Sequence, residues 1–175
     1  MYIVIIILVI IAIPLVLAAF LSEDYAIERD TIINQPKQKV FDFIKYLKNA
    51  DQYNKWIMMD PNLKKTYSGT DGTPGFTSYW DSENKNVGKG EQEIKSIREG
   101  ERVDYEIRFI KPFQGVSQAY IIAQAAQAGS TNVKWVFQGK RNYAMKLFHL
   151  LFNLKKVLGK DLQTSLDNLK AVLEK

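Results

Sequence analysis

Alternation of apolar and polar residues, repeated in one segment after another, is the feature that most restricts the fold of this chain. In residues 101–110, ERVDYEIRFI, charged residues alternate with the apolar Val103, Tyr105, Ile107 and Phe109. A period of two is typical of a β-strand that has one face in water and the other buried. Similar segments, separated by turns that contain Gly or Pro, run from residue 64 to residue 140. The pattern predicts consecutive antiparallel strands in one sheet with a single apolar face.

Helical periodicity replaces this alternation on both sides of the strand region. Residues 25–33, YAIERDTII, alternate like a first strand, and residues 37–49 then place apolar side chains at steps of three and four behind Pro36. A second short helical piece is expected near residues 50–56. Residues 144–175 keep a helical period to the last residue, with Gly159 expected to kink the helix rather than end it. The predicted order is one strand, two helices, six strands and one long helix.

This order of elements predicts how the apolar face of the sheet is covered. A sheet of six or seven antiparallel strands must bury its apolar face, and the terminal helix is the only large apolar partner available. We therefore predict an α+β fold in which a curved antiparallel sheet wraps around a long C-terminal helix. A wedge remains between a curved sheet and one helix, and such a concavity favours small apolar ligands.

An uncharged segment precedes this domain. Residues 2–21, YIVIIILVIIAIPLVLAAFL, contain no charge, and at ~1.5 Å per residue a helix of this length would span a hydrocarbon core of about 30 Å. A cleaved signal peptide, the alternative, would need a basic start and a shorter apolar stretch. The segment predicts a single-pass membrane protein with a transmembrane anchor at residues 1–22 and a folded domain at residues 23–175. The side of the membrane on which the domain lies stays open.

Residue counts exclude several kinds of site. The chain has no cysteine and one histidine, which rules out disulfides, thiolate ligands and cysteine nucleophiles and leaves no basis for a metal site or a cofactor. Residues 140–175 hold eight basic and three acidic residues and account for the whole net charge of +5. This basic end is interpreted as a solvated helix face or, alternatively, as a contact for anionic headgroups. Nucleic acid is not predicted as a partner, because the aromatic residues do not interleave with the basic ones.

Candidate catalytic groups are few, and no catalytic residue is assigned. His149 falls on a polar stripe of the predicted terminal helix, which favours a position in solvent. Asp104 and Glu106 form a carboxylate pair on the polar outer face of their strand. Glu91 and Glu93 form a second pair, which would reach the interior only if a bulge at Gly88 and Gly90 reversed the register.

Several motifs resemble one superfamily. They are YAIERDTIIN followed by PKQKVFDFI, NKW with Trp56, Asp60-Pro61, GTPGFTSYW with Trp80, VGKGEQEI, TNVKWVFQGK with Trp135, and LGKDLQTSLDNLKAVLEK. In this order, over residues 25–175, the chain is similar to the SRPBCC superfamily of START-like, helix-grip proteins, and within it to the bacterial polyketide cyclase/dehydrase-like proteins. A hydrophobic segment ahead of the domain is common among those members.

The resemblance implies a hydrophobic pocket between the sheet and the terminal helix. The chain is expected to be a membrane-tethered binding domain for a hydrophobic small molecule or lipid, with no cofactor. One alternative is a cyclase, dehydratase or hydrolase that uses Tyr79, Tyr105, Tyr120 or Arg98. A second is an interaction module that docks through Lys155 and Lys156. The residues expected to line the pocket are Trp56, Trp80, Tyr105, Phe109, Trp135, Phe137, Phe148, Leu151 and Phe152.

Overall fold

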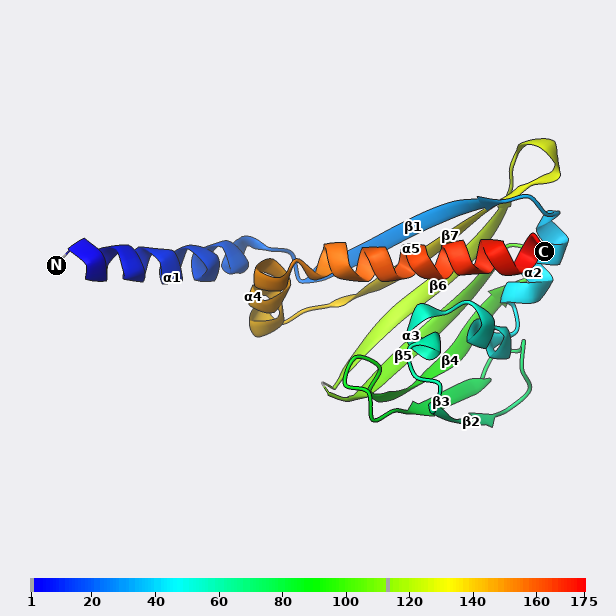
Figure 1. The fold of residues 1–175 in the computed structure, drawn as a ribbon, viewed down its shortest axis with the longest axis horizontal. Helices are drawn as coiled ribbons and strands as arrows, with labels where there is room; N and C mark the ends of the chain where they lie inside the picture. Colours follow the sequence, from blue (N-terminus) through cyan, green and yellow to red (C-terminus); the bar gives the residue numbers. More distant parts are fainter. Residues whose placement is uncertain (1, 113) are drawn as a thin grey trace.

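The computed structural model describes residues 2–112 and 114–175, apart from the side chains of residues 4 and 128. The order of helices and strands along the chain is much as the sequence predicts (Figure 1). The elements are α1 (Tyr2–Phe20), β1 (Asp24–Ile33), α2 (Lys37–Ile44), η1 (Leu47–Gln52), α3 (Lys55–Met58), β2 (Lys64–Ser68), β3 (Thr77–Asp81), β4 (Lys89–Arg98), β5 (Arg102–Lys111), β6 (Gly115–Ala125), η2 (Gln127–Gly129), β7 (Thr131–Lys140), α4 (Tyr143–Phe152) and α5 (Leu154–Leu173).

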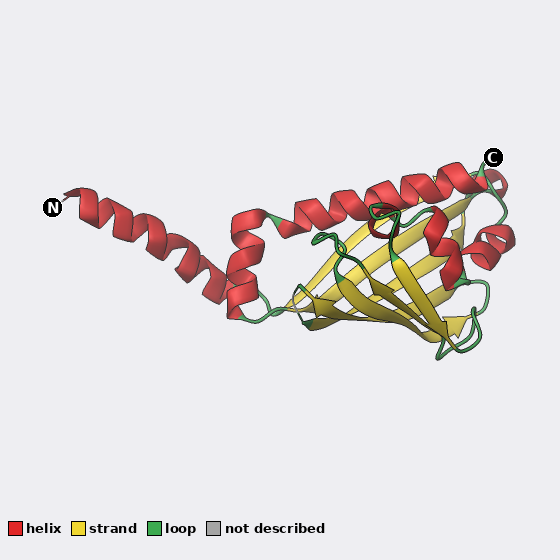
Figure 2. Ribbon diagram, turned by 60° about the horizontal axis from the view of Figure 1, so that its bottom comes forward, coloured by secondary structure: helices red, strands yellow, loops and turns green. Residues whose placement is uncertain are grey.

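One seven-stranded sheet carries the fold. Its strand order is β1-β7-β6-β5-β4-β3-β2, and every neighbouring pair is antiparallel. The sheet curves around α5, which runs across its concave side (Figure 2). The register shifts between Lys89 and Gly90, at one of the two glycines where a bulge was considered. The predicted α+β architecture, a curved antiparallel sheet closed over a C-terminal helix, is confirmed.

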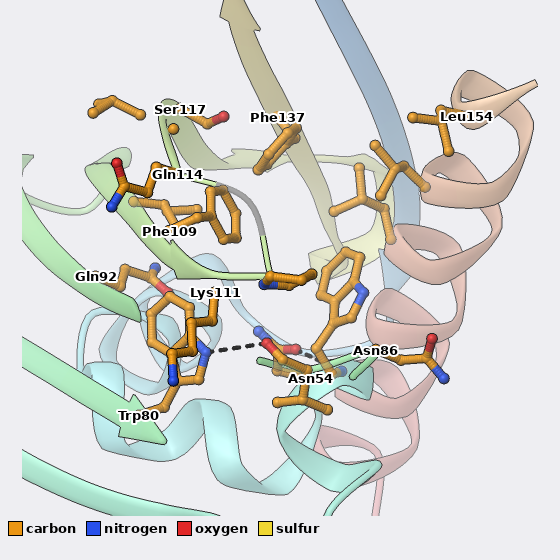
Figure 3. Close-up of a pocket in the computed structure, with 18 of the residues that line it drawn as sticks. Asn54, Trp80, Asn86, Gln92, Phe109, Lys111, Gln114, Ser117, Phe137 and Leu154 are labelled. Carbon is orange, nitrogen blue, oxygen red and sulfur yellow. Dashed lines mark hydrogen bonds between the residues drawn. The ribbon is translucent and has the colours of Figure 1, made fainter. Parts of the chain in front are cut away.

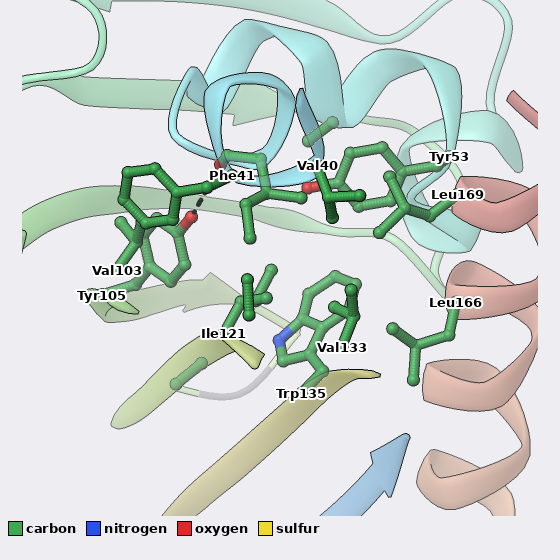
Figure 4. Close-up of a cluster of buried hydrophobic side chains, with 14 of the residues drawn as sticks. Val40, Phe41, Tyr53, Val103, Tyr105, Ile121, Val133, Trp135, Leu166 and Leu169 are labelled. Carbon is green, nitrogen blue, oxygen red and sulfur yellow. Dashed lines mark hydrogen bonds between the residues drawn. The ribbon is translucent and has the colours of Figure 1, made fainter. Parts of the chain in front are cut away.

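The buried core lies between the sheet and the second half of α5. Val103 and Tyr105 of β5 point at α2, and Leu166 and Leu169 of α5 complete the packing; all four side chains are at most 2% exposed (Figure 4). The hydroxyl of Tyr105 donates a hydrogen bond to the carbonyl oxygen of Ile44, 3.3 Å away. Helix α2 therefore closes this end of the sheet with no polar group of Tyr105 left unpaired.

The terminal helix is broken, unlike the single long helix that the sequence predicts. Asn153 adopts a left-handed conformation (φ 47°, ψ 48°) and separates α4 from α5. Asparagine tolerates this conformation better than most residues, because its short polar side chain can bond locally. Gly159, where a kink was expected, lies inside α5. Its missing Cβ makes room for Arg29 of β1, whose Nη2 would lie only 2.3 Å from that atom.

Helix α1 projects away from the sheet, and its C-terminal end rests on α4 (Figures 1 and 2). The hydroxyl of Tyr143 donates to the carbonyl oxygen of Leu15, 2.7 Å away, and Ala18 is buried. Beyond this contact, most of the apolar side chains of α1 are exposed.

The predicted membrane anchor is not supported. A bilayer crossing needs a helix that is both long and apolar enough, and none of the helices described within residues 2–112 and 114–175 satisfies that requirement. The prediction of a single-pass membrane localisation is therefore wrong. Met1, the first residue of the predicted anchor, lies outside the described residues.

Candidate functional site

A cavity of about 560 Å³ lies between the sheet and the first half of α5. Ligand pockets of small molecules typically measure roughly 300–1,000 Å³ and have mostly apolar walls. Here Phe109 and Phe137 project from the sheet, and Leu154 faces them from α5 (Figure 3). The remaining apolar lining includes Ile57, Leu63, Ile107, Val116, Met145, Leu158 and Leu162.

The inward face of β5 explains why the cavity begins where it does. Val103 and Tyr105 belong to the solid core, whereas Ile107 and Phe109, further along the same face, line the cavity. The inward face of β7 is divided in the same way, with Val133 in the core and Phe137 in the cavity wall. One apolar stripe of a strand thus meets packed side chains at one end and a hollow at the other.

Six of the nine residues predicted to line the pocket do line this cavity: Trp56, Trp80, Phe109, Trp135, Phe137 and Phe148. Tyr105 lies in the core instead. Leu151 and Phe152 are 60% and 59% exposed on α4, because the break at Asn153 turns this helix away from the sheet. The aliphatic residues of the lining were missed, although the period-two pattern places Ile107 on the inward face. A role in ligand binding stays a prediction for all nine residues.

Trp80 forms one wall because a glycine makes room for it. A Cβ on Gly90 would lie 2.5 Å from the Trp80 ring, so the indole can lie flat against β4 only at a glycine. The ring also meets Phe109 at 6.2 Å between centroids and an interplanar angle of 78°. Its Nε1 donates to the carbonyl oxygen of Val87, 3.3 Å away. Gly90 of β4 therefore shapes an aromatic wall of the cavity.

Trp56 is held beside the cavity by a helix cap. The side chain of Asn54 accepts a hydrogen bond from the backbone N–H of Trp56 at 3.0 Å and so caps α3. The next contact ties this short helix to α5, because the N–H of Lys55 donates to Ser165 Oγ, 3.0 Å away. Trp56 is only partly buried, as expected for a side chain near an opening.

The other end of the cavity is polar and is built from β1, β6, α4 and the residues before α4. Tyr25 and Ser117 project from two strands, and Arg141 and His149 complete the group. Arg141 Nη1 lies 3.3 Å from His149 Nδ1, and the rings of Tyr25 and His149 meet edge to face with centroids 4.8 Å apart. The backbone carbonyl of Ser22 accepts a hydrogen bond from Arg141 Nε at 2.9 Å. These contacts fix the guanidinium at the cavity wall.

His149 is buried, which differs from the solvent position that the sequence favours. It is 9% exposed, and α4 turns its polar stripe inward while Leu151 and Phe152 face outward. Burial lowers the pKa of His149, and the nearby charge of Arg141 lowers it further. Burial also raises the pKa of Tyr25, partly offset by a hydrogen bond with Ser117 and by Arg141. Near neutral pH the site therefore holds an uncharged imidazole, a protonated phenol and one guanidinium.

The groups considered for catalysis lie elsewhere. Tyr79 is 39% exposed, Arg98 is exposed, and Tyr120 stacks with Arg102 at 3.6 Å. Glu91, Glu93 and Glu106 all bond to Arg108, whose pKa these bonds raise. Neither carboxylate pair lines the cavity. Within the described part of the chain, no three His, Asp or Glu side chains gather as a metal site would require.

Comparison with models of known protein families gives one match. Residues 25–174 match the family described as "Polyketide cyclase / dehydrase and lipid transport". No curated protein matches the chain.

Solved structures show the same fold at low sequence identity. A Thermobifida fusca protein solved by NMR has a TM-score of 0.65 and 13% identity, over 85% of this chain and 92% of its own. Truncated norcoclaurine synthase from Thalictrum flavum has a TM-score of 0.63 and 9% identity, over 86% of this chain and 93% of its own. The crystal structure of Ara h 8.0201 has a TM-score of 0.59 and 15% identity, over 86% and 97%.

Proposed function

This chain belongs to the polyketide cyclase/dehydrase and lipid transport family, and from that premise we propose that it binds an apolar small molecule or lipid in the cavity between the sheet and α5. The observation that carries the proposal is the cavity itself. Its volume is about 560 Å³, and aromatic and aliphatic side chains supply most of its walls. Each Å² of apolar ligand surface that leaves water contributes roughly 25 cal/mol.

The aromatic side chains give the cavity a defined shape. Trp80 and Phe109 support one another at one wall, and Phe137 meets Tyr25 at 6.3 Å between ring centroids at the other. Rings braced in this way lose little freedom when a ligand enters, which favours binding. The polar end offers directional contacts, so the cavity suits a molecule with one polar end and an apolar body.

The proposal is tested by blocking the cavity from within. Nile red, an uncharged dye that fluoresces in apolar surroundings, is titrated into the purified full chain, and binding at one saturable site is expected. Ile107→Trp places a large side chain in the lining and should abolish this binding. Ile110→Trp is the matched control on the same strand, because Ile110 is 42% exposed and lies outside the lining.

Two outcomes would count against binding. The first is a wild-type chain that takes up no dye and yields no co-purified apolar compound on solvent extraction and mass spectrometry. The second is equal dye binding by both tryptophan variants, which would place the dye outside the cavity. Circular dichroism of each variant shows whether the fold is kept.

A second candidate function is an enzyme of the cyclase or dehydratase type that acts in the same cavity. The observation that favours it is the uncharged His149 beside protonated Tyr25 at the cavity wall, since a neutral imidazole can accept a proton from one atom of a bound substrate while a phenol donates its own proton to another. Conversion of a bound apolar substrate that is lost in His149→Gln, with dye binding retained, would support this function. Recovery of the bound compound unchanged would favour binding alone.

A further inference from the structure

We propose that the cavity takes an amphipathic carboxylate, with its apolar body between the sheet and α5 and its carboxylate against Arg141. This inference deepens the proposed function and rests on it, because it names the chemical class of the ligand. It is carried by the charge of the lining, by the contacts of Arg141 and by the path from the polar end to the aromatic walls.

The charged residues that line the cavity all have the same sign. They are Lys65, Lys85, Lys111, Lys140 and Arg141, and among the described residues no Asp or Glu belongs to the lining. A concavity with low-dielectric walls and charges of one sign focuses its field on an oppositely charged ligand. The domain over residues 22–139 is electrically balanced, so the sign of the lining does not simply follow the composition of the sheet.

Arg141 has an unused hydrogen-bonding edge. Its Nε donates to the carbonyl oxygen of Ser22, and its Nη1 meets His149 Nδ1. Within the described residues, no hydrogen bond of Nη2 to protein is found, and no carboxylate lies within ion-pair distance of the guanidinium. Lys65, by contrast, is paired with Asp51. Arg141 is thus a partly buried cation without a counter-charge, which a ligand carboxylate would supply.

A smaller hollow on the other side of this group does not change the argument. It measures about 240 Å³, shares Tyr25, Arg141 and His149 with the large cavity, and contains Asp24. Asp24 is exposed and forms no ion pair with Arg141. The guanidinium therefore stands in the wall between the two hollows, and only the large one has the apolar length to hold the body of an amphiphile.

The neighbours of Arg141 suit a carboxylate better than an uncharged head. His149 approaches it through Nδ1, which accepts from the guanidinium when the imidazole proton is on Nε2. Tyr25 keeps its proton and can donate to a second oxygen of the head. The charge and the donors are already in place, so little ordering is needed when the ligand binds.

The apolar body has a continuous path from this end. Tyr25 contacts Phe137 at one wall, Phe137 and Phe109 both line the cavity, and Phe109 contacts Trp80 at the other wall. A hydrocarbon chain or ring system attached to the carboxylate would lie along these rings, with Leu154 and Leu158 on the α5 side.

The test compares three molecules with one hydrocarbon chain: oleate, oleyl alcohol and methyl oleate. Each displaces Nile red from the full chain at low salt, at a pH where the acid is ionised. Because a charge-assisted hydrogen bond contributes more than a neutral one, oleate should bind roughly ten- to a hundredfold more tightly than the alcohol and the ester. The preference should be lost in Arg141→Gln and largely kept in Arg98→Gln, since Arg98 is exposed and lies outside the lining.

The outcomes separate the two proposals. Equal affinity of the wild-type chain for oleate, oleyl alcohol and methyl oleate would overturn the carboxylate inference and leave apolar binding intact. An oleate preference that survives Arg141→Gln would also overturn it. If Arg141→Gln fails to fold, two measurements on the wild-type chain still test the carboxylate inference. The first is the affinity for oleate relative to oleyl alcohol and methyl oleate. The second is the effect of added salt, which should weaken the binding of oleate and leave that of the two uncharged molecules unchanged. Failure of all three molecules and of the dye would instead overturn the proposed function.

Discussion

The space between the sheet and α5 has two halves, of which one is filled with packed side chains and the other holds the cavity. We call them the solid half and the hollow half. In the solid half, Leu166 and Leu169 of α5 meet Val103 and Tyr105 of β5, and these side chains are almost completely buried (Figure 4). In the hollow half, Leu158 of the same helix faces Ile107 and Phe109 of the same strand across the cavity. Apolar residues at the correct period are therefore insufficient to fill a core.

The difference comes from a third element, helix α2, which packs against the sheet and α5 in the solid half only. Helix α2 presses Val40, Phe41 and Ile44 into the solid half, so three elements share that space. At the hollow end the short α3 and α4 stand at the rim, and α4 turns Leu151 and Phe152 outward. A curved sheet and one helix leave a wedge, and only the half with an extra helix fills it.

The largest expected effect comes from truncating a leucine in the solid half. Leu166→Ala should lower the free energy of unfolding by about 2–5 kcal/mol, because it removes buried methyl groups and leaves a void in a close-packed region. Urea denaturation measures the change. Leu158→Ala, two turns earlier in the same helix, borders an existing cavity and should cost less. Equal losses in the two variants would show that the hollow half is packed as tightly as the solid one.

An intermediate effect on stability is expected at Asn153, the junction between α4 and α5 beside the hollow half. Asn153→Ala should destabilise the chain by roughly 1–2 kcal/mol, because alanine gains nothing from the left-handed conformation that breaks the helix. Asn153→Gly is the matched control and should stay close to wild type, since glycine adopts positive φ freely. Thermal unfolding distinguishes them. A stabilising Asn153→Ala would mean that α4 and α5 join into one helix in solution.

The smallest effect concerns pH and belongs to the polar end of the hollow half. The pKa of His149 is lowered in the folded chain, so the unfolded chain binds the proton more readily. As pH falls through the unfolded value of about 6.5, stability should decrease, and the loss should level off below the lowered folded pKa. The chain has one histidine, so His149→Phe should remove this part of the profile. A wild-type profile that is flat near this pH would contradict the burial of His149.

The polar end of the site was beyond sequence reasoning. Tyr25 and Ser117 are far in the chain from the neighbouring Arg141 and His149, and they meet these two only because β7 lies between β1 and β6 and leads directly into α4. Helical periodicity put His149 on a polar stripe, and polar stripes usually face water. The structure reverses that rule because the outward face of α4 is the apolar one. For α4, unlike α2 and α5, helical periodicity therefore does not report which face meets the rest of the domain.

The sequence by itself determined the strands, the order of elements along the chain and a helix that closes over the sheet, because periods of two and of three to four are local consequences of backbone geometry. The same alternation placed Phe109, Trp135 and Phe137 on the inward face. Tertiary structure alone decided where packing stops and the cavity begins, where the terminal helix breaks, and that Arg141 stands at the wall without a counter-charge. These properties depend on which distant segments meet, and that depends on the three-dimensional arrangement of the whole sheet.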